Sequence, residues 1–149
     1  METRPEISAR PVLSGPTVID TSAWIEALRS DGSGRARTLV DQAIEVGLAV
    51  IVDPVRAELA IGVRSRKDRE TLAGLLDVLP CLHVEPRTWR AAGELGVMAR
   101  SSGLTIPLVD LVIAALVLDN GFELLHADRH FTLLSAVTHL PQSWALEGD

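Results

Sequence analysis

Short apolar segments alternate with amphipathic segments along most of the chain. Residues 48–52 are apolar and mostly β-branched, which is typical of a buried strand. Residues 35–46 instead place Leu39 and Ala43 on one helical face, and this periodicity predicts an amphipathic helix. Gly47 follows directly, and glycine at this position favours the end of a helix.

The predicted elements follow one another as strand, helix and strand. The predicted strands are 17–19, 48–52, 81–84 and 122–125, with 137–140 as a candidate last strand. The predicted helices are 22–28, 35–46, one that starts at 53, 67–79, 88–101 and 107–119, followed by a short helical turn over 131–136. This alternation predicts an α/β fold, a three-layer sandwich in which helices flank a mainly parallel central sheet.

Two predicted helices begin at a proline. Asp53 and Pro54 directly follow the second strand, where Asp suits the N-cap and Pro the first helical position. The helix that starts there carries Glu58. Pro107 opens a second, strongly apolar helix over 107–119, and Gly121 lies just beyond its end.

The first residues differ in composition from the rest of the chain. Residues 1–16 contain charges and three prolines but no apolar stretch of the kind that marks a signal peptide, so we expect a flexible N-terminal arm. Residues 17–149 have a length that suits a single domain. The longest apolar run, 111–118, is too short to cross a bilayer, so we expect no membrane partner. Cys81 is the only cysteine, which excludes an intrachain disulfide and favours the cytoplasm.

The chain has a formal net charge of −6 at pH 7. Because most nucleic-acid-binding proteins are basic, this charge argues weakly against such a partner. It suits a protein that gathers carboxylates around metal ions. One basic stretch is a candidate for attracting phosphates, although a solvated helix start is the simpler explanation: Arg64, Arg66, Lys67 and Arg69.

Four acidic residues lie where predicted strands end or predicted helices begin. Asp20 follows the first strand, and Asp128 follows the fourth. Glu58 lies one turn into the helix after the second strand, and Asp110 lies in the first turn of the helix that Pro107 opens. Active sites of open parallel sheets form beyond the carboxyl ends of the strands. We therefore expect the four carboxylates to converge on one cleft.

Converging carboxylates repel one another unless cations lie between them. Oxygen ligands suit Mg²⁺ or Mn²⁺, so Asp20, Asp110 and Asp128 are the predicted metal ligands. Each acid also has a simpler explanation when taken alone. Asp20 and Asp128 suit cap or turn positions, Asp110 suits the dipole of its helix, and Glu58 suits a solvated helix face. Their joint placement at one edge of the sheet favours a functional site.

Four segments resemble, in order, the motifs of PIN-domain nucleases and in particular of VapC-type toxins. These segments are VIDTSAWI (18–25), VRAELAIG (55–62), IPLVDLVIAA (106–115) and LLHADRHF (124–131). Each motif alone is weakly specific, but four in order with fitting separations are strong. The resemblance extends from about residue 18 to residue 139 and implies a PIN-like form of the predicted sandwich.

The resemblance implies a metal-dependent endoribonuclease that acts on RNA, forms a homodimer and is held inactive by a cognate antitoxin. Asp20, Glu58, Asp110 and Asp128 match the acidic positions of the family. Ser22 matches a hydroxyl position often near the metal. His126 and Arg129, in the fourth motif, are further candidates for contacting the substrate or supporting the metal ligands. Many relatives carry Thr where this chain has His126.

Several other residues have structural explanations. Asp53 is expected to be a plain N-cap, and Cys81 to pack in the core. Trp24 and Trp89 are expected to be core or interface anchors, and Trp24 with Ile25 and Leu28 to give the early helices apolar surface beyond the needs of the core. The four histidines show no spacing typical of metal ligands, which argues against zinc: His83, His126, His130 and His139.

Two other functions compete with the nuclease. An aspartyl-phosphate phosphatase would use Asp20 as its nucleophile, but it would need an acid two residues later, where Ser22 stands. A PIN-like interaction module that has lost catalysis is the second alternative. Intact acids at all four positions argue against it.

Overall fold

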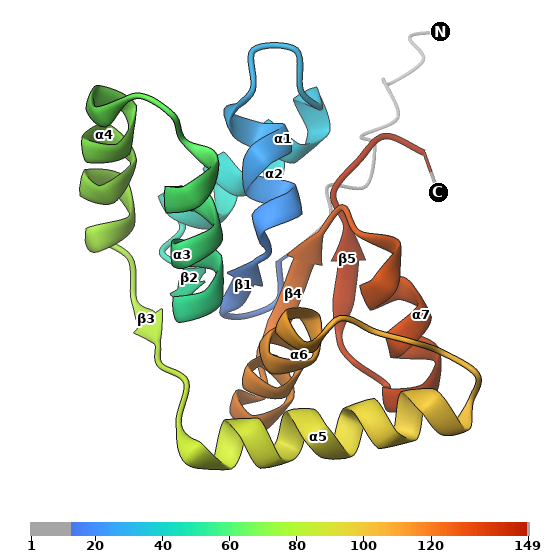
Figure 1. Cartoon of the computed structure of the whole chain (residues 1–149). Helices are drawn as coiled ribbons and strands as arrows, with labels where there is room; N and C mark the ends of the chain where they lie inside the picture. Colours follow the sequence, from blue (N-terminus) through green and yellow to red (C-terminus); the bar gives the residue numbers. More distant parts are fainter. Residues whose placement is uncertain (1–12, 149) are drawn as a thin grey trace, which may run out of the picture.

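A five-stranded, wholly parallel sheet organises residues 13–148, which are the residues that the computed structural model describes (Figure 1). The strand order is β3-β2-β1-β4-β5, with β1 at the centre. The strands are β1 (Thr17–Ile19), β2 (Ala49–Val52), β3 (Cys81–Leu82), β4 (Glu123–His126) and β5 (Gln142–Trp144). The predicted α/β fold with a mainly parallel sheet is therefore confirmed.

Seven helices connect and cover the strands. They are α1 (Thr21–Leu28), α2 (Gly34–Glu45), α3 (Asp53–Gly62), α4 (Arg66–Asp77), α5 (Pro86–Ser101), α6 (Leu108–Asn120) and α7 (Arg129–Thr138). The helix α1 packs against α2 and α3, whereas α5 packs against α6 and α7. Figure 1 shows α6 in front of β4, and α5 running across the lower end of α6.

Burial follows the order of the strands. Every residue of β1 and β2 is buried, as expected for strands covered on both faces. The helix α6 is apolar on all sides, and residues 111–117 are all buried. Such a helix belongs in the core and not on a surface. Asp110 directly precedes this buried stretch, so the position of α6 places a carboxylate at the edge of the core.

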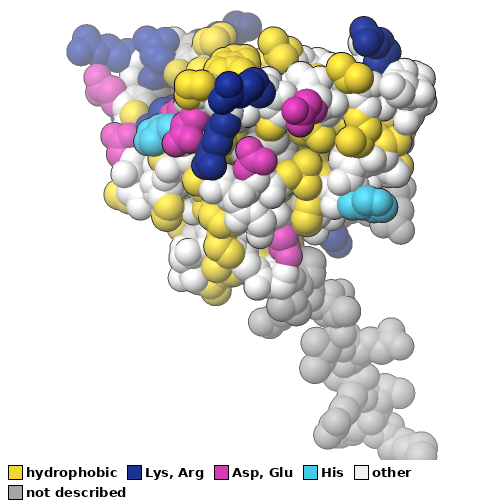
Figure 2. All heavy atoms as spheres, turned by 90° about the horizontal axis from the view of Figure 1, so that it is seen from below, with side chains coloured by type: hydrophobic (Ala, Val, Ile, Leu, Met, Phe, Trp, Pro, Cys, Tyr) yellow, Lys and Arg dark blue, Asp and Glu magenta, His cyan; other side chains and the backbone are white. Residues whose placement is uncertain are grey.

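Apolar side chains also remain exposed on the outer helices. Figure 2, which views the molecule from the side of α5, shows apolar side chains among charged ones. On α5 these include Trp89, Val97 and Met98, which are about half exposed. Trp24, in contrast, is fully buried, so the expectation that it adds surface to the early helices is wrong. Its neighbours Ile25 and Leu28 are exposed, as expected.

The structure corrects the prediction at the C-terminal end. Residues 137–140 do not form a strand, because α7 is a full helix that continues to Thr138. His139 ends that helix in the left-handed conformation, with φ 56°. The last strand is β5, three residues further along. Val137, which was expected in a strand, instead packs against the core from α7.

The N-terminal boundary of α3 also differs from the prediction. Val52 is the N-cap residue, and Asp53 is the first residue of the helix. The Asp53 carboxylate makes no cap hydrogen bond and instead accepts the backbone N–H of Val84 at 3.0 Å. Asp53 is thus turned toward β3, and its predicted role as a plain N-cap is wrong.

The predicted arm lies largely outside the described residues, since residues 1–12 are not among them. The division into an arm over 1–16 and one domain over 17–149 stays a prediction. Among the described residues, no helix combines the length and the apolar character needed to cross a membrane.

Gly32 provides a test of the packing between α1 and α2. A Cβ at this position would lie 2.0 Å from the backbone oxygen of Glu26, which cannot move without disturbing α1. We expect Gly32→Ala to reduce the free energy of unfolding by about 2 kcal/mol or more, as overpacking of rigid backbone does. Urea denaturation measures this loss. Gly34→Ala is the control, since its Cβ would meet only the end of the Glu147 side chain at 3.8 Å. Equal midpoints for the two variants would contradict the packing described here.

Candidate active site

Asp20 lies at the carboxyl end of the central strand. Its backbone N–H donates to the carbonyl of Leu125 on β4, so the end of β1 is fixed against its neighbour. The side chain caps α1 by accepting the backbone N–H of Ser22 at 3.0 Å. Asp20 is only 4% exposed. Burial raises the pKa of its carboxyl group, while the hydrogen bonds from Ser22 oppose that rise and the nearby charge of Asp128 adds to it.

Ser22 ties two segments of the site together. Its hydroxyl donates to the Asp20 carboxylate at 2.5 Å and accepts the backbone N–H of Ala127 at 2.9 Å. Ala127 directly precedes Asp128. The bonds of one hydroxyl group therefore fix the start of α1 against the turn that carries Asp128. The sequence analysis expected Ser22 near the metal ligands, and the structure shows it supporting two of the segments that carry them.

Asp128 caps the helix that follows β4. Its carboxylate accepts the backbone N–H of His130 at 2.9 Å. Its own backbone N–H donates to Nδ1 of His126 at 3.3 Å. On the other side of the ring, Nε2 of His126 bonds to Oε1 of Gln142 at 2.6 Å. These partners fit a neutral His126 with its proton on Nε2. Burial likewise lowers the pKa of His126.

His126 is fully buried, between the rings of Phe131 and Trp144. The ring is therefore out of reach of a substrate. The sequence analysis considered two roles for His126, contact with the substrate and support of the metal ligands. The geometry agrees with the second, because His126 holds the loop that carries Asp128.

Asp110 approaches Asp128 from α6. Burial, followed by the charges of Asp128 and Asp20, raises the pKa of Asp110 to about 6. His130 opposes this rise, since its Nδ1 lies 3.1 Å from Asp110 Oδ2 and 3.2 Å from Asp128 Oδ1. Asp110, Asp128 and His130 thus present donor atoms that all lie within 4.8 Å of one another.

His130 is the residue that the sequence analysis missed. The histidine spacing alone argued against any metal-ligating histidine, but the ring lies between two of the predicted ligands. The available signal was its position two residues after Asp128, in the first turn of the following helix. Only the approach of α6 places Asp110 against the same ring.

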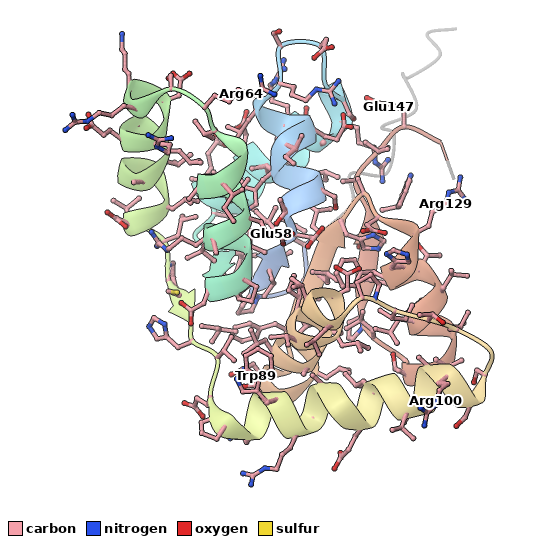
Figure 3. The ribbon with its side chains drawn as sticks, in the orientation of Figure 1. Glu58, Arg64, Trp89, Arg100, Arg129 and Glu147 are labelled. Carbon is pink, nitrogen blue, oxygen red and sulfur yellow. The ribbon has the colours of Figure 1, made fainter. Side chains whose placement is uncertain are left out.

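Glu58 stands at the edge of this arrangement. Figure 3 shows it on α3, on the side toward α1, where Oε1 accepts the hydroxyl of Thr21 at 2.9 Å. The side chain is exposed. Thr21 follows Asp20 directly, so the hydrogen bond from Thr21 connects Glu58 to the segment that carries Asp20. The structure thus brings Asp20, Asp110 and Asp128 close together, with Glu58 beside them.

Arg129 and the basic stretch lie outside the carboxylate cluster. Arg129 begins α7 and lines a groove of about 310 Å³ with Leu133 and Trp144. The basic residues 64–69 are exposed around the start of α4, where Arg66 pairs with Glu70. Both features offer positive charge at the surface of an acidic protein.

The donor set fits a divalent cation. Asp110 and Asp128 bring two carboxylates within 4.8 Å, a separation at which two unit charges repel by about 3 kcal/mol at an effective dielectric near 20. Burial is the main cause of the raised pKa values of Asp20 and Asp110, and the charges of the neighbouring carboxylates raise both further. A cation removes this repulsion, and carboxylate oxygens are the ligands that Mg²⁺ and Mn²⁺ prefer.

The sequence pattern of the PIN domain matches residues 17–136. That span covers most of the chain and contains all four acidic residues. The chain belongs to the PIN-domain family. The resemblance drawn from the four motifs is therefore confirmed. Nucleases of the PIN family are metal-dependent, in agreement with the carboxylate cluster.

Named relatives place this PIN-domain chain beside the VapC proteins. Ribonuclease VapC11 of Mycobacterium tuberculosis is 33% identical over 129 residues, which cover 83% of this chain and 94% of the relative. Ribonuclease VapC18 of the same organism is 32% identical over 130 residues, which cover 85% and 92%. Among solved structures, VapBC2 from Rickettsia felis bound to a promoter DNA fragment has a TM-score of 0.70 at 18% identity, and the match covers 86% of this chain and 97% of that chain. At this low identity the structural match shows the fold alone.

The stability of the metal-free protein tests the carboxylate cluster. Because the pKa of Asp110 rises from 3.8 to about 6 on folding, its contribution is fully favourable below pH 4 and is lost as pH rises through 6. Asp110→Asn removes this dependence. In EDTA near neutral pH, we expect the variant to be more stable than the parent by about 1 to 2 kcal/mol, less than the roughly 3 kcal/mol of the full shift because contact with His130 is also lost.

Thermal melts across this pH range, with EDTA or excess Mg²⁺, measure the difference. Mg²⁺ should shrink or reverse the gain, since the parent binds the cation better. If Asp110 merely complements its helix dipole, the variant would instead lose about 0.3 to 1 kcal/mol with or without the metal.

Proposed function

We propose that this chain is a metal-dependent endoribonuclease that hydrolyses RNA phosphodiester bonds and acts as the toxin of a toxin–antitoxin pair. The convergence of Asp20, Asp110 and Asp128 at the carboxyl ends of β1 and β4 carries this proposal. It occurs in a PIN-domain chain whose relatives are named VapC ribonucleases. A cytoplasmic location, expected from the single cysteine, is part of the same proposal.

The three aspartates are the proposed ligands of one or two Mg²⁺ or Mn²⁺ ions. A bound cation of this kind lowers the pKa of a coordinated water and stabilises negative charge on phosphate oxygens. In this proposal Glu58, which is exposed and accepts a hydrogen bond from the Thr21 hydroxyl, completes the ligand shell or orients a water molecule. In the metal-free chain, Nδ1 of His130 contacts one carboxylate oxygen of Asp110 and one of Asp128, and these are oxygens that a cation would also use.

Ser22 and His126 act as positioning residues in this proposal. Ser22 orients the Asp20 carboxylate, and His126 holds the backbone of Asp128. The geometry at Ser22 disfavours an aspartyl-phosphate phosphatase. Its hydroxyl is occupied by Asp20 and the Ala127 N–H, and no acid stands there to protonate a leaving group.

An apolar groove between α1 and α3 is the proposed surface for the antitoxin. Ile25 and Leu28 are 42% and 51% exposed and line a groove of about 320 Å³ together with Glu58. A partner seated in this groove would cover Glu58 and so block access to one side of the carboxylates. The expected homodimer also stays a prediction, which sedimentation of the purified chain tests.

Cleavage of a fluorescent RNA tests the catalytic proposal. EDTA should abolish cleavage, and Mg²⁺ or Mn²⁺ should restore it, because the proposed ligands are oxygen atoms. Asp110→Asn should reduce the rate by about a hundredfold or more, since one carboxylate of the cation site is lost. The matched control is Asp119→Asn, at the exposed end of the same helix. Cleavage that persists in EDTA, or an Asp110→Asn variant as active as the control, would rule out the proposed site.

Co-purification of the antitoxin with this chain, both expressed from the native operon, tests whether the antitoxin binds the groove between α1 and α3. Leu28→Asp places a charge on the apolar lining, and we expect it to weaken retention of the antitoxin by about tenfold or more. Because Leu28 is half exposed, we expect the variant to fold like the parent, which circular dichroism checks. Val78→Asp is the control, because Val78 is 77% exposed at the end of α4. Equal retention by both variants would place the partner elsewhere.

A further inference from the structure

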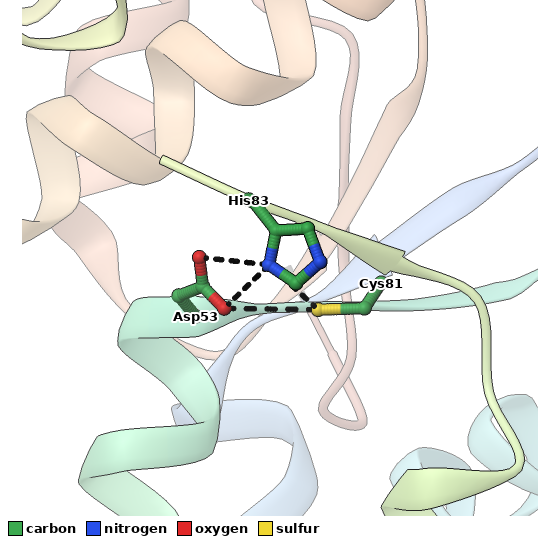
Figure 4. Close-up of side chains that lie close together, drawn as sticks. All are labelled: Asp53, Cys81 and His83. Carbon is green, nitrogen blue, oxygen red and sulfur yellow. Dashed lines mark hydrogen bonds and ion pairs between the residues drawn. The ribbon is translucent and has the colours of Figure 1, made fainter. Parts of the chain in front are cut away.

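A second group of metal-ligating side chains lies at the β2–β3 edge of the sheet. Asp53, Cys81 and His83 converge where β2 ends and β3 runs past it (Figure 4). The Cys81 Sγ atom lies 3.8 Å from Asp53 Oδ1 and 3.8 Å from His83 Nδ1. The same Nδ1 lies 3.0 and 3.2 Å from the two oxygens of Asp53. Three different donor atoms thus surround one small volume.

The local backbone arranges these donors. Cys81 begins β3, and His83 stands two residues later, so extended chain directs both side chains to the same face. Asp53 is the first residue of α3, directly after β2. Its Oδ2 accepts the backbone N–H of Val84, which holds the carboxylate against the segment that carries His83. The pairing of β2 with β3 therefore creates the group.

The arrangement differs from that of a cysteine protease. In a catalytic Cys-His-Asp triad, the thiol and the carboxylate bond to opposite nitrogens of the imidazole ring. Here Cys81 and Asp53 both face Nδ1 of His83. Burial and the charge of Asp53 also raise the pKa of the Cys81 thiol, whereas a nucleophilic cysteine needs a lowered pKa. Convergence on a single point is instead what a shared ion requires.

The separations fit tetrahedral coordination. Zinc lies about 2.3 Å from thiolate sulfur and about 2.0 to 2.2 Å from imidazole nitrogen or carboxylate oxygen, so tetrahedral donors stand roughly 3.3 to 3.6 Å apart. The donor separations of 3.0 to 3.8 Å bracket these values. A shift of a few tenths of an ångström in exposed side chains brings them into agreement, and the His83 side chain is 73% exposed.

We propose that Asp53, Cys81 and His83 form a binding site for a thiophilic divalent cation of the Zn²⁺ class. Cys81 and His83 also line a cavity of about 220 Å³, which leaves room for water or an external ligand at a fourth position. Sulfur and nitrogen donors select such a cation over Mg²⁺, so this site is chemically distinct from the cluster of aspartates. The proposal does not depend on the proposed ribonuclease activity.

A bound ion would stabilise the position of β3, the strand at this edge of the sheet. The strand β3 has only two residues and pairs only with β2 among the described strands. A cation held by Cys81, His83 and Asp53 connects this edge strand to the first turn of α3. Because it binds the folded arrangement, it stabilises the native state by mass action.

Cobalt titration of the purified full chain tests the proposal. The buffer contains excess Mg²⁺ to occupy the aspartate cluster. Because Cys81 is the only cysteine, a thiolate-to-cobalt charge-transfer band in the near ultraviolet reports this site alone. We expect the band to saturate at one Co²⁺ per chain, to disappear when Zn²⁺ is added, and to be absent in Cys81→Ser. Zn²⁺ should also raise the melting temperature of the parent but not of Cys81→Ser.

Substitutions at His83 and Asp53 distinguish a site built from three ligands from binding by a single thiol. His83→Ala and Asp53→Asn should each weaken cobalt binding by about tenfold or more, since each removes one of three ligands. His139→Asn is the matched control, because His139 is exposed and Asn tolerates its left-handed backbone. Circular dichroism confirms that each variant folds. The absence of the band at stoichiometric cobalt, or unchanged affinity in both His83→Ala and Asp53→Asn, would overturn the proposal.

Discussion

Mutual repulsion of carboxylates at the carboxyl ends of β1 and β4 is the constraint on which the site depends. Asp20 is buried at the end of the central strand, and Asp110 lies on a helix whose next seven residues are all buried and apolar. Most of each carboxylate is therefore held away from water. The protein therefore meets the charge with local hydrogen bonds and with His130, and it leaves the rest of the compensation to a cation.

The surrounding structure is organised to hold these charges in place. Ser22 joins the start of α1 to the loop after β4, and His126 accepts the backbone N–H of Asp128 in the same loop while its other ring nitrogen bonds to Gln142 on β5. Each of these contacts uses a neutral donor or acceptor. Neutral supports orient the carboxylates without satisfying their charge, which keeps the carboxylates available for a cation.

The chain also separates two kinds of donor chemistry on one sheet. The central strands carry aspartates, whereas the β2–β3 edge carries sulfur, nitrogen and one carboxylate. Asp53 illustrates the difference between position and role. Its place before a proline suggested a helix cap, yet its carboxylate is turned to Val84 and His83. Once β3 pairs with β2, these partners compete successfully with the helix N-terminus.

The sequence by itself determined the alternation of strands and helices, the parallel sheet and the positions of four acids, because hydrophobic periodicity and helix-end residues are local signals. The four motifs also identified the family correctly. Local signals fail where contacts join distant residues. The apolar residues 137–140 mimicked a strand, and nothing near His83 or His130 in the sequence marks their distant partners, Asp53 and Asp110. Only the tertiary structure decided which side chains meet, because the pairing of β2 with β3 and the packing of α6 beside β4 bring together residues 20 to 30 positions apart.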